Sequence, residues 1–183
     1  DNLTIVDSEI TTPQGSAQDI ACVFNISNGT LTIERANIHG CSAGISSGGG
    51  VVRDSYVHDL SQIRGLSHNV GIASNGGGGM TIEHNTVFNQ FKQTSAISFY
   101  QDFSAQKDNF VHDNLLAGGG YCIYGGAGDR GPTSNIRILD NRLSRRYFQN
   151  CGSYGVLAAF KPDDSGNSFS GNYWDDTGQD VEG

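Results

Sequence analysis

The amino-acid sequence predicts an all-β fold, a parallel β-helix of about six to seven coils with three short strands in each coil. Three observations predict it: a short block recurs about every 28 residues, two places in the block are always apolar, and the composition favours turns. The chain has 183 residues, of which 26 are Gly, 3 are Pro and 16% are charged. Such a composition is typical of short strands joined by turns, whereas a helical bundle is rich in Leu, Glu and Lys.

The recurring block can be aligned seven times, and each copy is expected to hold two short strands. The copies are LTIVDSEI (3–10), LTIERANI (31–38), GVVRDSYV (50–57), MTIEHNTV (80–87), NFVHDNLL (109–116), IRILDNRL (136–143) and NSFSGNYW (167–174). The third place is apolar throughout: Ile5, Ile33, Val52, Ile82, Val111, Ile138 and Phe169. The eighth place is apolar as well: Ile10, Ile38, Val57, Val87, Leu116, Leu143 and Trp174. Both columns are expected to face a common core, because the side chains of a strand alternate between its two faces.

The sixth place of the block is a column of small residues that ends in four Asn. Its members are Ser8, Ala36, Ser55, Asn85, Asn114, Asn141 and Asn172. Asn tolerates the left-handed backbone conformation, so the column predicts a tight bend between two strands. Stacked Asn side chains are also expected to bond one another from coil to coil.

A third apolar site follows the blocks after a loop of variable length. Its residues are Cys22, Ile45, Ile72, Ile97, Ile123 and Val156. Three strands per repeat disfavour a β-propeller, whose blades have four strands and hairpin turns. A leucine-rich repeat is disfavoured because its L-x-x-L-x-L-x-x-N pattern is missing. We expect one domain over residues 1–183, shaped as a rod ~31 Å long.

The charge of the chain bounds its partners. The formal net charge is -8 and the isoelectric point is about 4.8, and no run of Lys or Arg forms a basic stripe. Nucleic acid is therefore not expected as a partner. Membrane insertion is not expected either, because no apolar stretch approaches the ~18 residues that cross a bilayer.

The four Cys residues predict disulfides or inert buried thiols rather than a metal site. They form no CxxC pair and no zinc-type spacing with His, so no metal or other cofactor is expected. Cys22 and Cys122 lie about four coils apart, ~19 Å at the strand spacing, whereas a disulfide holds its Cα atoms within ~7 Å. Pairs between neighbouring coils remain, and in an oxidised chain we expect Cys22–Cys41 and Cys122–Cys151. Oxidised pairs favour an extracellular or virion setting.

The two ends of a β-helix expose sheet edges and core, and such ends are usually capped or paired. No capping helix is predicted before Leu3 or after Trp174. We therefore expect a segment of a longer secreted or tail protein, with flanking domains or a homo-oligomer covering the ends.

Five segments carry a resemblance to a known family: DSYVHDL (54–60), SHNVGI (67–72), TIEHNTV (81–87), DNLLAGGGYCIYGG (113–126) and NYWDDTG (172–178). They resemble the right-handed parallel β-helix repeat family, the superfold of pectate lyases and many phage tailspikes. The likeness is greatest to β-helix domains of secreted actinobacterial proteins and actinobacteriophage minor tail proteins. The resemblance implies a right-handed helix, an extracellular or virion location, and a carbohydrate groove on the sheet formed after the long loops. The family often has Asp at the position of Val70, so no acid-dependent role is carried over to that residue.

That sheet, the first sheet of each coil, is expected to expose mostly small side chains. The outward set is Ala21, Val23, Gly44, Ser46, Asn69, Gly71, Ala73, Ala96, Ser98, Tyr100, Cys122, Tyr124, Leu157 and Ala159. It contains no carboxylate, which disfavours a calcium-dependent lyase and a hydrolase with paired carboxylates. The acidic pairs Asp163–Asp164 and Asp175–Asp176 are expected in terminal turns away from this sheet.

Recognition of a polysaccharide or cell-surface glycan is the function that the sequence favours. Aromatic faces over a flat, polar-rimmed groove suit sugar rings. The predicted binding residues are Asn69, Ser98, Tyr100, Gln101, Asp102, Tyr124, Arg146 and Tyr147. The alternative interpretation of the stacked Tyr residues is ordinary packing between strands.

Two other functions stay open. A metal-independent polysaccharide lyase, or a glycoside hydrolase on the same face, is the first. In the lyase, His68 would be the base, Tyr100 or Tyr124 the acid, and Arg64, Lys92 or Arg146 would neutralise the sugar carboxylate. A structural rod in a tail or adhesin is the second. The remaining His residues, His39, His58, His84 and His112, are expected to face solvent in stacked columns.

Overall fold

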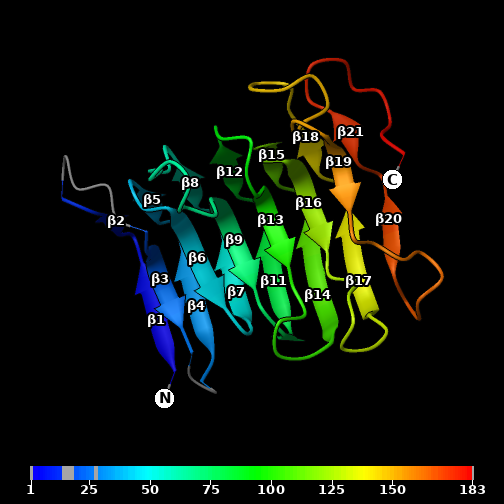
Figure 1. Ribbon diagram of the computed structural model, residues 1–183, viewed down its shortest axis with the longest axis horizontal. Coiled ribbons are helices and arrows are strands. Elements are labelled where there is room, and N and C mark those ends of the chain that lie inside the picture. The colour runs from blue at the N-terminus through cyan, green and yellow to red at the C-terminus, as the bar shows by residue number, and fades with distance from the viewer. Residues whose placement is uncertain (1, 14–18, 27–28, 183) are drawn as a thin grey trace.

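The computed structural model describes residues 2–13, 19–26 and 29–182 and shows a parallel β-solenoid of about 6 turns (Figure 1). Sheet A consists of β1 (Leu3–Val6), β4 (Leu31–Glu34), β7 (Gly50–Arg53), β11 (Met80–Glu83), β14 (Gln106–His112), β17 (Ser134–Leu139) and β20 (Ser168–Ser170), with β10 (Gly77–Gly78) paired to β14. Sheet B consists of β2 (Glu9–Thr11), β5 (Asn37–His39), β8 (Tyr56–His58), β12 (Thr86–Asn89), β15 (Leu115–Gly118), β18 (Arg142–Leu143) and β21 (Tyr173–Trp174). Sheet C consists of β3 (Ala21–Asn25), β6 (Ala43–Ser47), β9 (Val70–Ser74), β13 (Ser95–Phe99), β16 (Tyr121–Gly125) and β19 (Gly155–Ala158). The predicted all-β parallel helix with three strands per coil is confirmed.

The core of sheets A and B follows the two predicted apolar columns. Strand pairing in sheet A aligns the third places of all seven blocks, from Ile5 to Phe169. Pairing in sheet B aligns the eighth places, from Ile10 to Trp174. Between the end coils these side chains are fully buried, so burial of one aliphatic side chain per strand stabilises each coil against the next.

The inward row of sheet C differs from its predicted column at both ends. Pairing aligns Val23, Ile45, Ile72, Ile97, Ile123 and Leu157. The prediction placed Cys22 and Val156 in this row and Val23 and Leu157 outside, which is wrong by one residue. A loop of variable length precedes each strand of sheet C, so spacing from the block does not determine the register.

A second row of sheet C also faces inward, at the corner with sheet B. A Cβ added to Gly44 would lie 2.5 Å from Cγ1 of the core residue Val57, and one added to Gly71 would lie 2.3 Å from Cγ1 of Val87. Their pairing neighbours along the row, Ala96 and Cys122, are fully buried. The prediction that these four residues point outward is wrong, because the backbone bends here and places two successive residues on the core side.

This close packing predicts that Gly71→Ala destabilises the fold. The added methyl group would also lie 2.5 Å from the carbonyl oxygen of Ala96, in backbone that cannot move without disturbing β13. We expect the free energy of unfolding to fall by about 2 kcal/mol. Urea unfolding measures it, with Gly48→Ala as the control, because the nearest atom to that Cβ is 3.9 Å away. Equal stability of the two variants would contradict the packing described.

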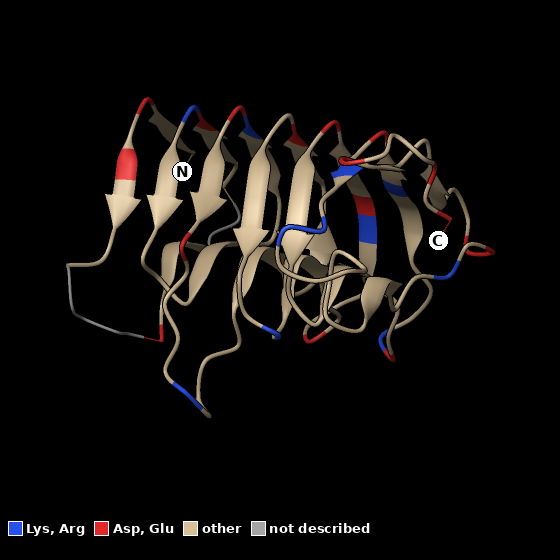
Figure 2. Ribbon diagram, turned by 90° about the horizontal axis from the view of Figure 1, so that it is seen from above, with Lys and Arg blue, Asp and Glu red and all other residues tan. Residues whose placement is uncertain are grey.

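The bends between sheets A and B carry the predicted Asn ladder. Asn85 Nδ2 donates to Asn114 Oδ1 at 3.0 Å, and the same bond joins Asn114 to Asn141 and Asn141 to Asn172 at 2.9 Å. The left-handed backbone lies one residue earlier than predicted, at Asp7, Arg35, Asp54, His84, Asp113 and Asp140. The Asn side chain turns inward to the neighbouring coil, and the preceding residue stays outside. Figure 2 shows these bends in one line along an edge of the solenoid, with charged residues on most of them.

The two ends of the solenoid differ. At the first coil Leu3, Phe24 and Ile26 are exposed hydrophobic side chains. At the last coil residues 175–182 return along β21, where Trp174 N–H donates to Gln179 O at 2.9 Å and Val181 N–H donates to Asn172 O at 2.8 Å. No helix is described after Trp174, as expected, and an antiparallel bridge between Tyr173 and Asp180 covers part of the edge of sheet B.

Both predicted disulfides are confirmed. Cys22 pairs with Cys41 and Cys122 pairs with Cys151, each with a Cα–Cα distance of 5.5 Å. Each bridge joins neighbouring coils and is compatible with an extracellular protein. Within residues 2–13, 19–26 and 29–182 there is no helix that is long and apolar enough to span a bilayer.

Candidate functional site

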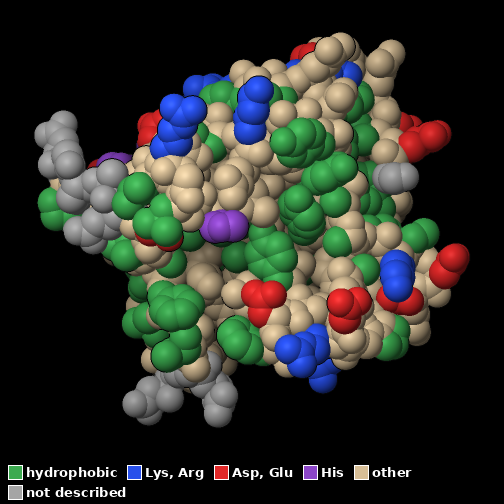
Figure 3. All heavy atoms as spheres, in the orientation of Figure 1, with side chains coloured by type: hydrophobic (Ala, Val, Ile, Leu, Met, Phe, Trp, Pro, Cys, Tyr) green, Lys and Arg blue, Asp and Glu red, His purple; other side chains and the backbone are tan. Residues whose placement is uncertain are grey.

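A groove with a volume of about 870 Å³ lies on the outer face of sheet C, over β3, β6, β9 and the start and end of β13. In the space-filling view the hollow lies beside a group of hydrophobic side chains over β13, β16 and β19 (Figure 3). The groove therefore occupies the sheet on which the sequence places a carbohydrate site.

The floor of the groove is flat because two outward rows of sheet C carry small side chains between Phe24 on β3 and the Tyr residues beyond β13. Ala21, Ala43 and Val70 are register partners in one row. In the second row, Ser46 lies between Phe24 and Ala73. The row continues to Tyr124 on β16, where a large ring replaces the small side chains. Tyr124 does not line the groove, and Tyr100 closes it on that side.

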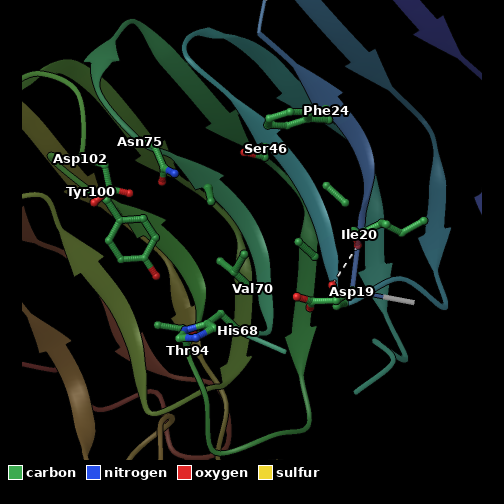
Figure 4. Close-up of a pocket in the computed structure, with 14 residues that line it drawn as sticks. Asp19, Ile20, Phe24, Ser46, His68, Val70, Asn75, Thr94, Tyr100 and Asp102 are labelled. Atoms are coloured by element: carbon green, nitrogen blue, oxygen red, sulfur yellow. Dashed lines mark hydrogen bonds between the residues drawn. The ribbon is translucent and has the colours of Figure 1, made fainter. Parts of the chain in front are cut away.

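Loops supply the two long walls. His68 and Thr94 precede β9 and β13, and Asp19 precedes β3, so these three lie where the strands begin. Asn75 and Asp102 lie beyond the ends of β9 and β13 on the opposite wall. Figure 4 shows the two sets facing each other across the floor, with Asp19 and Asp102 at diagonal corners.

Tyr100 forms the end wall and contacts its neighbour on the next coil. The ring centroids of Tyr100 and Tyr124 are 6.0 Å apart, with the planes tilted by 43°. Tyr124 packs in turn against Tyr121, edge to face, at 5.6 Å. The expected stack of the two Tyr residues on adjacent coils is present, but only Tyr100 lines the groove.

Burial around Tyr100 predicts an unusually weak acid. Burial raises the pKa of its hydroxyl above the ordinary 10.0, and the hydroxyl of Ser98 lowers it in part. A phenol is protonated at neutral pH even with its ordinary pKa, so the Tyr100 hydroxyl can donate a hydrogen bond to a ligand, and the raised pKa extends this state to higher pH. We expect the ¹³Cζ signal of Tyr100, assigned with Tyr100→Phe, to titrate above pH 10. A midpoint at or below pH 10 would contradict the buried wall.

Three of the predicted site residues line the groove: His68, Tyr100 and Asp102. Gln93 Nε2 lies 3.3 Å from His68 Nδ1. Among the described residues that line the groove, Arg64 and Lys92 are not found, although both are exposed in neighbouring loops.

Three other predicted binding residues have structural partners instead. Asn69 is fully buried and donates to the carbonyl oxygens of Ser42 and Ser61. Ser98 is fully buried too, and its hydroxyl bonds that of Ser95. Gln101 donates to Gly131 O at 3.0 Å and accepts from Arg130 N–H at 2.8 Å, which fixes the loop after β16. None of these three lines the groove.

Arg146 and Tyr147 lie against sheet B, so their predicted place beside the groove is wrong. The Arg146 guanidinium lies 5.0 Å from the ring centroid of Phe88, and the Tyr147 ring meets Phe88 edge to face at 6.1 Å. Phe88 belongs to β12. The loop between β18 and β19 folds back over that strand, a path that its length alone does not reveal.

His39, His58 and His112 lie on the outer faces of sheets A and B, and His84 lies in a bend between the two sheets. His39 and His58 are register partners on sheet B, and their ring centroids are 5.2 Å apart. His58 Nε2 bonds Asn37 Oδ1 at 2.8 Å, and on sheet A His112 Nε2 bonds Glu83 Oε2 at 2.9 Å. The ring nitrogens are thus used in contacts between coils.

Sequence reasoning missed eight lining residues: Asp19, Ile20, Phe24, Ser42, Ala43, Val70, Asn75 and Thr94. One signal could have found the first of them, because Asp19 and His68 precede the apolar sites at Cys22 and Ile72 by similar distances. Within the described ranges, His, Cys, Asp and Glu side chains do not gather in threes as metal ligands.

Comparison with protein families, with curated proteins and with solved structures finds no match to this chain. The geometry of the groove is therefore the basis for assigning a function.

Proposed function

We propose that the groove on sheet C binds an extended extracellular glycan. The observation that carries the proposal is a flat, largely apolar floor edged by an aromatic ring and hydrogen-bonding side chains. Sugar rings present apolar C–H faces and polar edges, and this combination suits both. From β3 to β13 the groove crosses three strand spacings, about 14 Å, which favours a chain of sugars over a single ring.

The groove favours binding over cleavage. A lyase that removes a proton beside a uronate needs a cation to neutralise the sugar carboxylate. None of the three cations that the sequence suggested lines the groove. Arg146 lies over sheet B, and Arg64 and Lys92 lie in neighbouring loops. His68 as the base and Tyr100 as the acid would therefore lack the cation that the lyase mechanism needs in the groove.

The two disulfides support placing the glycan outside the cell. We infer a domain of a secreted or virion-borne protein that contacts a cell-envelope or matrix polysaccharide. In such a protein the stacked coils would hold the groove rigid.

A panel of oligosaccharides tests the proposal. Xylohexaose, cellohexaose, mannohexaose, hexa-N-acetylchitohexaose and hexagalacturonate are each titrated by calorimetry, while unsaturated products and released reducing ends are followed by absorbance. Binding without product supports the proposal. Product formation would make the groove an active site, and the absence of both signals would favour a structural rod.

A further inference from the structure

The described residues that line the sheet-C groove include acidic side chains but no Lys or Arg. Two carboxylates, Asp19 and Asp102, line it at diagonal corners. Of the described residues that line the groove, none is Lys or Arg. The positions outside the description, 1, 14–18, 27–28 and 183, contain no Lys or Arg in the sequence.

From this we infer that the groove selects uncharged glycans and rejects polyuronates, with Asp19 and Asp102 as the specificity-determining residues. The inference rests on the proposed glycan binding and names the class of glycan. A uronate on the floor would meet Asp19 and Asp102, while Arg64 and Lys92 lie in neighbouring loops and not among the described lining residues. Like charges at an interface suppress the wrong partner. The whole chain adds to the repulsion, because its formal net charge is -8.

An uncharged sugar can form hydrogen bonds with the same two carboxylates. A carboxylate accepts hydrogen bonds from hydroxyl groups, and bonds to an ionised acceptor are stronger than neutral ones. The C–H faces of the rings, or the methyl group of an N-acetyl substituent, can lie on Ala43 and Val70 between the two corners. The rim and the floor therefore complement a neutral polymer.

The test compares hexagalacturonate with the neutral hexasaccharides at pH 8 in low and high salt. We expect at least one neutral probe to bind about tenfold more tightly than hexagalacturonate at low salt. We expect the difference to shrink near 1 M salt, where the Debye length is about 3 Å. The double variant Asp19→Asn, Asp102→Asn is expected to bind hexagalacturonate more tightly than the wild type does.

A matched control changes the same charge elsewhere. Asp113→Asn with Asp140→Asn alters two exposed residues in the bends between sheets A and B, where Asn accepts the left-handed backbone. This variant is expected to keep the wild-type preference, which would exclude a mere effect of net charge.

The outcomes separate the two proposals. Equal or tighter binding of hexagalacturonate by the wild type would overturn the selectivity and leave glycan binding standing. An unchanged preference in the Asp19→Asn, Asp102→Asn variant would overturn the assignment to these residues. Failure of every probe to bind would overturn the proposed function itself, and the selectivity with it.

Discussion

Ser46→Trp is expected to abolish glycan binding while leaving the fold intact. Ser46 points outward from β6 in the middle of the groove floor, between Phe24 and Ala73 in the register of sheet C. An indole group there would occupy the space that a sugar ring needs. We expect the dissociation constant of any bound oligosaccharide to rise at least about 100-fold, measured by calorimetry.

The matched control places the same side chain on another sheet. Thr81 is a half-buried residue of β11 in sheet A, next to Val51 and Phe110 in register. Thr81→Trp is expected to bind the oligosaccharide like the wild type. If it lost binding while Ser46→Trp kept it, the ligand would lie on sheet A.

Asn114→Ala is expected to cause a large loss of stability. The Asn114 amide donates to Ile82 O, His112 O and Asn141 Oδ1, at 2.8 to 2.9 Å. Its oxygen accepts from the backbone N–H of Asn85 at 2.9 Å. Removing the Asn114 side-chain amide leaves several buried polar groups without partners, which lowers the free energy of unfolding by about 3 kcal/mol.

Urea unfolding measures that loss, and Asn150→Ala provides the control. Asn150 is exposed, so its truncation is expected to change stability by less than about 0.5 kcal/mol. Equal effects of the two substitutions would mean that the ladder does not stabilise the stack of coils.

Most of the fold could be predicted because two of its three sheets obey a fixed spacing. The residues from Ile5 to Phe169 and from Ile10 to Trp174 occupy constant places in the repeated block, and strand pairing aligns them. Sheet C follows loops of variable length, so Cys22 and Val156 were placed one residue from the true inward row. Periodicity predicts what a repeat makes regular and fails where loops change length.

The site was predictable in location but only partly in composition. His68, Tyr100 and Asp102 lie next to strands of sheet C, so their distance along the chain from the predicted strands places them at the groove. Arg146 belongs to a long loop whose path depends on packing against Phe88, a contact that no local pattern encodes. Asn69 illustrates a different difficulty, since a polar residue beside a groove can be fully used by buried carbonyl groups.

Nuclear magnetic resonance tests the central claim most directly. Backbone amide shifts of the ¹⁵N-labelled protein are followed as the tightest-binding oligosaccharide of the panel is added. The groove assignment predicts the largest shifts in β6, β9 and the residues that flank β13, with Asn75 and Asp102 among them. Shifts confined to sheet A, or to the His39–His58 face of sheet B, would contradict it.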